Sequence, residues 1–67
     1  MAKFPEILKY LREEKGLSQI ELGKKLGLGE ATIGRWERGR QIPNIEYLET
    51  LARFFGVTAG YLIGMED

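Results

Sequence analysis

The chain has 67 residues, 43% of them hydrophobic and 30% charged, a composition typical of one small globular domain. It contains no cysteine and no histidine, which excludes disulfide frameworks, zinc sites of the usual kind and His-based catalytic triads. Its ten basic and ten acidic side chains give no net charge, and we expect a protein that is not an enzyme and holds no metal or cofactor.

Four glycines follow stretches of helical periodicity: Gly16, Gly27, Gly39 and Gly56. Because glycine accepts the positive φ at which many helices end, these residues predict helix C-termini. The first helix is predicted over residues 4–15, where apolar side chains recur at i, i+3, i+4 and i+7. Ser18 and Glu21 have the spacing of a capping box, which predicts a second helix over residues 19–26.

The third helix, predicted over residues 30–38, follows the second after a very short turn at residues 27–29. So short a connection forces two helices to cross steeply, as in a helix-turn-helix. Gly23 is the small residue expected where the two helices touch, since a glycine within a helix otherwise only weakens it. Ile33 and Trp36, three residues apart, are expected to face inward from the third helix.

Two further helices are expected after the third. Asn44 is a suitable N-cap for a helix over residues 45–55, and Thr58 can cap a short fifth helix that Gly64 closes. We find no strand-like alternation and no internal repeat. The predicted fold class is therefore all-α, with five short helices around one core.

The outer face of the third helix carries no large apolar side chain. The four-residue step groups five residues on this face: Glu30, Ala31, Gly34, Arg35 and Arg38. An α-helix fits the major groove of B-DNA, where arginine can bond guanine, glutamate can accept from cytosine and an alanine methyl can meet thymine. Gly34 would let the helix backbone approach the DNA closely, and Arg38 and Arg40 are placed for phosphates.

Three segments in fixed order carry a resemblance to a known family: REEKGLSQIELGKKLG, TIGRWERG and IPNIEYLETLARFFGV. With these motifs, about residues 4–64 resemble the Cro/C1-type helix-turn-helix family, also called the XRE family, of bacterial and phage transcriptional regulators. The resemblance implies a five-helix, lambda-repressor-like DNA-binding domain over residues 1–67, with its helix-turn-helix at residues 19–38. Double-stranded DNA is the partner that it implies.

The resemblance also implies roles for individual residues. The residues implied to face DNA bases are Gly29, Glu30, Ala31, Gly34 and Arg35. The residues implied to contact phosphates are Gln19, Thr32, Arg38, Arg40 and Asn44, with Gln19 aided by the N-terminus of the second helix. Arg12 and Glu37 are implied to form a largely buried ion pair that ties the first helix to the third.

Several residues allow two interpretations. We interpret Trp36 as a core residue rather than one that stacks on a base, because it shares a side of the helix with Ile33. Glu30 is either a base-reading residue or an acid that is favourable in the first turn of a helix. Four large apolar residues exceed what so small a core needs, and they indicate either peripheral packing or a dimerisation patch: Tyr47, Phe54, Tyr61 and Ile63.

Two functions are consistent with these observations. The first is a sequence-specific DNA-binding transcriptional regulator, expected to be a repressor that binds a near-palindromic operator as a homodimer. The alternative is a protein-interaction module on the same fold, of the antitoxin or anti-repressor type, which the zero net charge and the acidic residues 45–67 favour.

The cellular setting follows from the same patterns. No apolar run approaches the roughly 18 residues that span a bilayer, and the N-terminus has no hydrophobic signal core. We therefore expect a cytoplasmic protein with no membrane association and no small-molecule ligand. The chain is either complete or the DNA-binding part of a longer protein.

Overall fold

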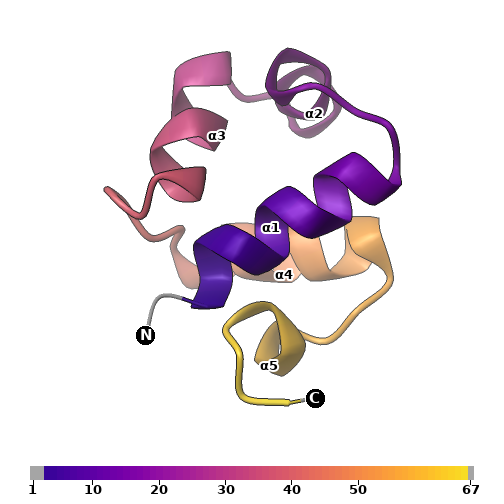
Figure 1. The fold of residues 1–67 in the computed structure, drawn as a ribbon, viewed down its shortest axis with the longest axis vertical. Coiled ribbons are helices and arrows are strands. Elements are labelled where there is room, and N and C mark those ends of the chain that lie inside the picture. The colour runs from indigo at the N-terminus through magenta and orange to yellow at the C-terminus, as the bar shows by residue number, and fades with distance from the viewer. Residues whose placement is uncertain (1–2, 67) are drawn as a thin grey trace.

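The computed structural model describes residues 3–66, which form five helices around one core (Figure 1). The helices are α1 (Lys3–Glu14), α2 (Gln19–Leu26), α3 (Glu30–Glu37), α4 (Ile45–Phe55) and α5 (Ala59–Leu62). The all-α prediction is confirmed, and no strand occurs within the described range. The ends of the predicted domain, residues 1, 2 and 67, lie outside it.

Local capping signals place the helix boundaries close to their predicted positions. At α2, the Ser18 Oγ accepts from the Glu21 backbone N at 3.0 Å, and the Ser18 N donates to the Glu21 Oε1 at 2.8 Å. This backbone hydrogen bond to the carboxylate lowers the pKa of Glu21 below its usual value. At α4 the Asn44 Oδ1 accepts from the Tyr47 backbone N, and at α5 the Thr58 Oγ1 accepts from the Tyr61 backbone N.

Three helix ends differ from the prediction by one residue. Both ends of α1 lie one residue earlier than expected. At the C-terminal end, Lys15 already belongs to the turn that Gly16 closes at a φ of 69°. In α3 the last residue is Glu37, and Arg38 is the C-cap with a φ of −90° and a ψ of 0°. Gly39 then takes the left-handed conformation that the sequence predicted for it.

The core draws at least one fully buried side chain from each helix. These side chains are Leu8, Leu22, Ile33, Trp36, Leu51 and Leu62. Each buried apolar side chain of this size contributes about 1.5–3 kcal/mol to stability. Trp36 is 1% exposed, which confirms that it is a core residue. Its Nε1 has no hydrogen-bond partner within residues 3–66.

The α2–α3 turn touches α2 at Gly23. A Cβ at this position would lie 2.7 Å from the Leu28 carbonyl oxygen and 3.3 Å from the Gly29 carbonyl carbon. Both are backbone atoms, so no side-chain rotation could relieve the overlap. The missing side chain therefore lets the turn pack directly on α2, and this contact sets the direction in which α3 leaves the turn. Figure 1 shows α3 beside α2, with α1 crossing below both.

Gly23→Ala is expected to lower the free energy of unfolding by about 1–3 kcal/mol, because its methyl group would overlap the Leu28 carbonyl oxygen. Urea unfolding followed by Trp36 fluorescence measures this change. Gly29→Ser is the matched control, since a Cβ at residue 29 would meet no described atom within 4 Å. A serine there can also cap α3, so this control should gain a few tenths of a kcal/mol. Equal stability of Gly23→Ala and the wild type would contradict the tight contact.

Candidate nucleic-acid interface

The two sides of α3 differ sharply in burial. Ile33 and Trp36 face the core and are buried. On the opposite side Glu30, Ala31 and Arg35 are exposed, and Arg38 and Arg40, which follow the helix, are exposed as well. Gly29, the N-cap of α3, is also exposed. The polar face that the sequence predicted is therefore on the molecular surface, braced by two core side chains.

Gly34, expected to offer open backbone to DNA bases, lies beneath two side chains in this structure. Gly34 is buried, because side chains from two neighbouring segments cover it. A Cβ at residue 34 would lie 3.0 Å from the Arg38 Nη1 and 3.5 Å from the Gln19 Oε1. The four-residue step of the helix places Arg38 over Gly34, and the start of α2 brings Gln19 across. Gly34 thus makes room for these two side chains within the chain itself.

An ion pair joins α1 to the end of α3. The Arg12 Nε donates to the Glu37 Oε2 at 2.6 Å, and the Arg12 Nη2 donates to the Glu37 Oε1 at 3.0 Å. The Arg12 Nη1 also donates to the Leu17 carbonyl oxygen at 2.8 Å, which holds the α1–α2 loop. The hydrogen bond to Glu37 raises the pKa of Arg12 above its usual value, although burial opposes this. Arg12 is 8% exposed, so the pair is largely removed from water.

Gln19 joins the same network. Its Nε2 donates to the Glu37 Oε1 at 3.0 Å, and its side chain is half-buried. Gln19, the expected phosphate-contact residue, therefore binds the same Glu37 carboxylate as Arg12. Gln19 is the first residue of α2, where backbone N–H groups that lack partners within the helix face outward.

The other candidates for phosphate contact lie on α3 or shortly after it. Thr32 is half-buried on α3, whereas Arg38, Arg40 and Asn44 are exposed. The Asn44 Oδ1 accepts from the Tyr47 backbone N at 2.8 Å, so its oxygen is committed to capping α4 and its amide N–H groups remain. The structure thus brings Gln19 and Arg38 together over Gly34, while Asn44 lies at the far end of the α3–α4 loop.

Arg35 has a partner that the sequence analysis did not identify. Its Nε donates to the Gln41 Oε1 at 2.9 Å. Gln41 lies in the α3–α4 loop, and both side chains are exposed. A separation of six residues across a helix end is not a helical spacing, so periodicity could not have indicated this contact.

The four residues of the possible dimerisation patch differ in exposure and in their contacts. The Tyr47 ring packs at 5.8 Å from that of Trp36, and the Phe54 ring lies edge-on to Phe55 at 5.0 Å. The Lys15 Nζ sits 5.5 Å from the Phe54 ring centroid. Of the four residues, Tyr47 and Ile63 are exposed, whereas Phe54 and Tyr61 are half-buried. These contacts favour peripheral packing for Tyr47 and Phe54.

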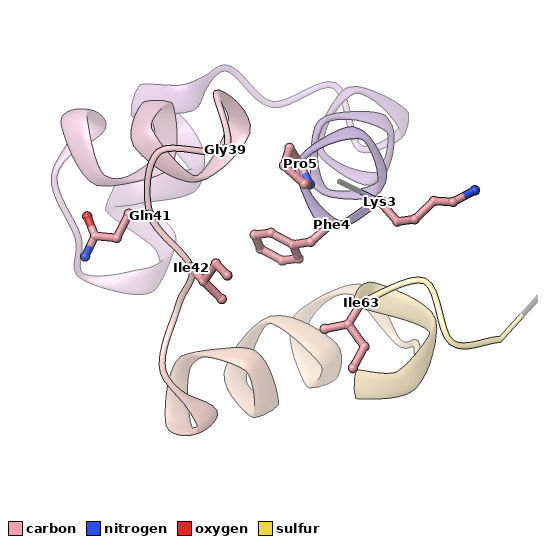
Figure 2. Close-up of a pocket in the computed structure, with 7 residues that line it drawn as sticks. All are labelled: Lys3, Phe4, Pro5, Gly39, Gln41, Ile42 and Ile63. Atoms are coloured by element: carbon pink, nitrogen blue, oxygen red, sulfur yellow. The ribbon is translucent and has the colours of Figure 1, made fainter. Parts of the chain in front are cut away.

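A separate apolar depression opens between α1, the α3–α4 loop and the end of α5. Figure 2 shows Phe4, Ile42 and Ile63 around it. Its volume is about 250 Å³, and Ile42 is 77% exposed.

Within residues 3–66, no helix has the length and apolar character needed to cross a membrane, and no cluster of acidic side chains could hold a metal ion.

Comparison with known proteins matches this chain to one family and several relatives. A family model described as helix-turn-helix matches residues 8–62. The transcriptional activator BcrR of Enterococcus faecalis is 37% identical over 97% of this chain and 32% of its own length. The phage CTXphi transcriptional repressor RstR of Vibrio cholerae is 37% identical over 90% of this chain and 54% of its own length. The chain thus spans about a third and about half of these two relatives.

A solved structure agrees with the fold. The crystal structure of the hypothetical transcription factor NHTF from Neisseria superposes with a TM-score of 0.83 at 31% identity. The similarity covers 92% of this chain and 71% of that one. The five helices and their arrangement are therefore those of a helix-turn-helix protein.

Glu37→Leu is expected to lower the free energy of unfolding by about 3–5 kcal/mol, because it leaves the buried Arg12 guanidinium without its counter-charge. Arg12→Met should have a similar effect. The double variant should be more stable than either single one, since apolar groups of similar volume then replace both charges. Arg53→Met, at an exposed arginine of α4, is the control and should change stability by less than about 0.5 kcal/mol. Additive losses in the double variant, measured by urea unfolding, would contradict the pairing.

Proposed function

Since this chain belongs to the Cro/C1-type (XRE) helix-turn-helix family, whose members are transcriptional regulators and not enzymes, we propose that it binds a specific DNA operator through α3. One observation carries the proposal: α3 buries Ile33 and Trp36 and presents Arg35 on its opposite, solvent-exposed side. Residues 1–67 would then act as one domain, with a core over residues 4–64 and the helix-turn-helix at residues 19–38.

In this proposal α3 lies in the major groove. Arg35 donates two hydrogen bonds to the O6 and N7 of a guanine, the commonest specific contact of this kind. Ala31, one turn earlier, meets a thymine methyl group, and Glu30 and the backbone of Gly29 face the adjacent base pair. When Arg38 and Gln19 turn to phosphates, the backbone of Gly34 faces the bases as well.

The DNA backbone is held from both sides of α3. Gln19 at the N-terminus of α2 donates to a phosphate, where the helix dipole favours a negative charge. Thr32, Arg38, Arg40 and the amide of Asn44 contact further phosphates. These contacts fix the register of the protein on the duplex, and the arginines make binding weaken as salt concentration rises.

We further propose that the protein acts as a homodimer on a near-palindromic operator and represses a promoter by occluding it. A single domain of this size offers only the low end of a specific DNA interface, so a second copy would supply the remaining contacts. Occlusion needs only occupancy of the DNA, whereas activation requires a further contact with the transcription machinery. Of the two relatives, one is a repressor and one an activator, so the proposal of repression rests on this physical argument. The DNA target would place the protein in the cytoplasm.

Selection of bound sequences from random double-stranded DNA tests the operator. We expect a symmetric consensus whose two half-sites lie about 34 Å apart, close to one turn of B-DNA. A single asymmetric half-site would contradict the dimer while leaving DNA binding intact. Recovery of no consensus, together with capture of a stoichiometric protein partner, would instead favour a protein-interaction module.

Arg35→Ala is expected to weaken binding to the selected operator by about 1–3 kcal/mol and to relax the preference for guanine at one position of each half-site. Arg53→Ala is the matched control, because Arg53 lies on α4 and takes no part in the proposed interface. Mobility-shift titration of both variants on the operator and on singly substituted operators measures the effect. Unchanged affinity and base preference in Arg35→Ala would remove this residue from the interface.

A further inference from the structure

Arg35 and Arg12 are paired in opposite ways. Arg12 is buried against the carboxylate of Glu37, so its charge is balanced within the protein. Arg35 is exposed, and its partner is the neutral carboxamide of Gln41. An amide oxygen accepts a hydrogen bond from a guanidinium without cancelling its positive charge. The contact with Gln41 therefore restrains Arg35 and leaves its full charge available to DNA.

The geometry of this contact leaves the outer edge of the guanidinium free. Gln41 takes the Nε–H of Arg35 at 2.9 Å, and this N–H lies on the inner side of the planar group. The two Nη atoms, with four N–H donors, remain for another partner. A hydrogen bond to Nε also fixes the plane of the group, because it restricts rotation about the last bonds of the side chain. A fixed plane with two free nitrogens is what a bidentate contact with a guanine requires.

The backbone around Gln41 is itself held to the turn that carries Arg35. The Arg40 backbone N donates to the Arg35 carbonyl oxygen at 2.9 Å, and the Gly39 N donates to the Trp36 carbonyl oxygen at 3.1 Å. Figure 2 shows the Gln41 amide extending away from Phe4 and Ile42, so its polar end is not engaged in the apolar depression. The acceptor for Arg35 thus projects from a loop that is anchored to the end of α3.

We propose that Gln41 is a positioning residue for DNA recognition, which orients the Arg35 guanidinium for a bidentate contact with guanine. The inference rests on the proposed function, since it assigns a role within the same surface. Gln41 need not contact DNA. It acts by reducing the number of orientations that Arg35 loses on binding, which is the usual advantage of preorganisation.

A double-mutant cycle on the selected operator tests the proposal. Gln41→Met has similar length but no acceptor, and it should lower the preference for guanine at the Arg35 position by about three- to tenfold, in the range for residues of one hydrogen-bond network. The same change made together with Arg35→Ala should have no further effect on base preference. Gln41→Glu keeps the acceptor, so it should retain the guanine preference while binding all sequences more weakly through its added negative charge. Trp36 fluorescence during unfolding verifies that each variant folds.

Three outcomes overturn the inference. If Gln41→Met weakens binding to every DNA sequence equally, and does so also in the Arg35→Ala variant, then Gln41 contacts DNA itself. Tighter binding or unchanged preference in Gln41→Met would mean that the amide competes with DNA for Arg35 or does not restrain it. In each of these cases the wild type still binds its operator and Arg35→Ala still loses guanine preference, so the proposed function survives. If the wild type binds no selected DNA, the proposed function fails, and this inference fails with it.

Discussion

The arrangement of the first three helices depends on the hydrogen bonds that the Glu37 carboxylate accepts. Glu37 ends α3, accepts two hydrogen bonds from Arg12 on α1 and accepts a third from Gln19 on α2. Arg12 in turn binds the Leu17 carbonyl oxygen in the α1–α2 loop. A buried carboxylate is tolerated only when such partners replace its water, and here the partners come from two other helices, α1 and α2. The end of α3 is consequently fixed in both position and rotation.

This fixed rotation determines which residues of α3 face solvent. Ile33 and Trp36 fill the core behind the helix, and the Tyr47 ring packs against Trp36 from α4. The exposed side is left with Glu30, Ala31 and Arg35, which have no structural duty in the core. The helix thus separates the side chains that hold the fold from those that are free to meet a partner.

The sequence predicted the helices well because their ends depend on local chemistry. The capping box at Ser18 and Glu21 satisfies backbone groups within one turn, so its spacing alone locates the start of α2. Gly23 could be predicted as a helix contact because a glycine within a helix lowers stability unless close packing requires it. The covering of Gly34 and the Gln41–Arg35 bond could not, since they join side chains across separate segments at spacings without a period. For Tyr47 and Phe54, apolar character did not distinguish a free patch from packing against neighbours within the chain.

The tight junction at Gly23 is separate from the exposed positions of α3. The Leu28 carbonyl oxygen and the Gly29 backbone rest on α2 where residue 23 has no side chain, and the exposed residues of α3 take no part in that contact. Exchange of residues 30, 31 and 35 would thus leave the angle between α2 and α3 unaltered. The same helical framework can therefore carry different side chains on the exposed face of α3 without rearrangement of the core.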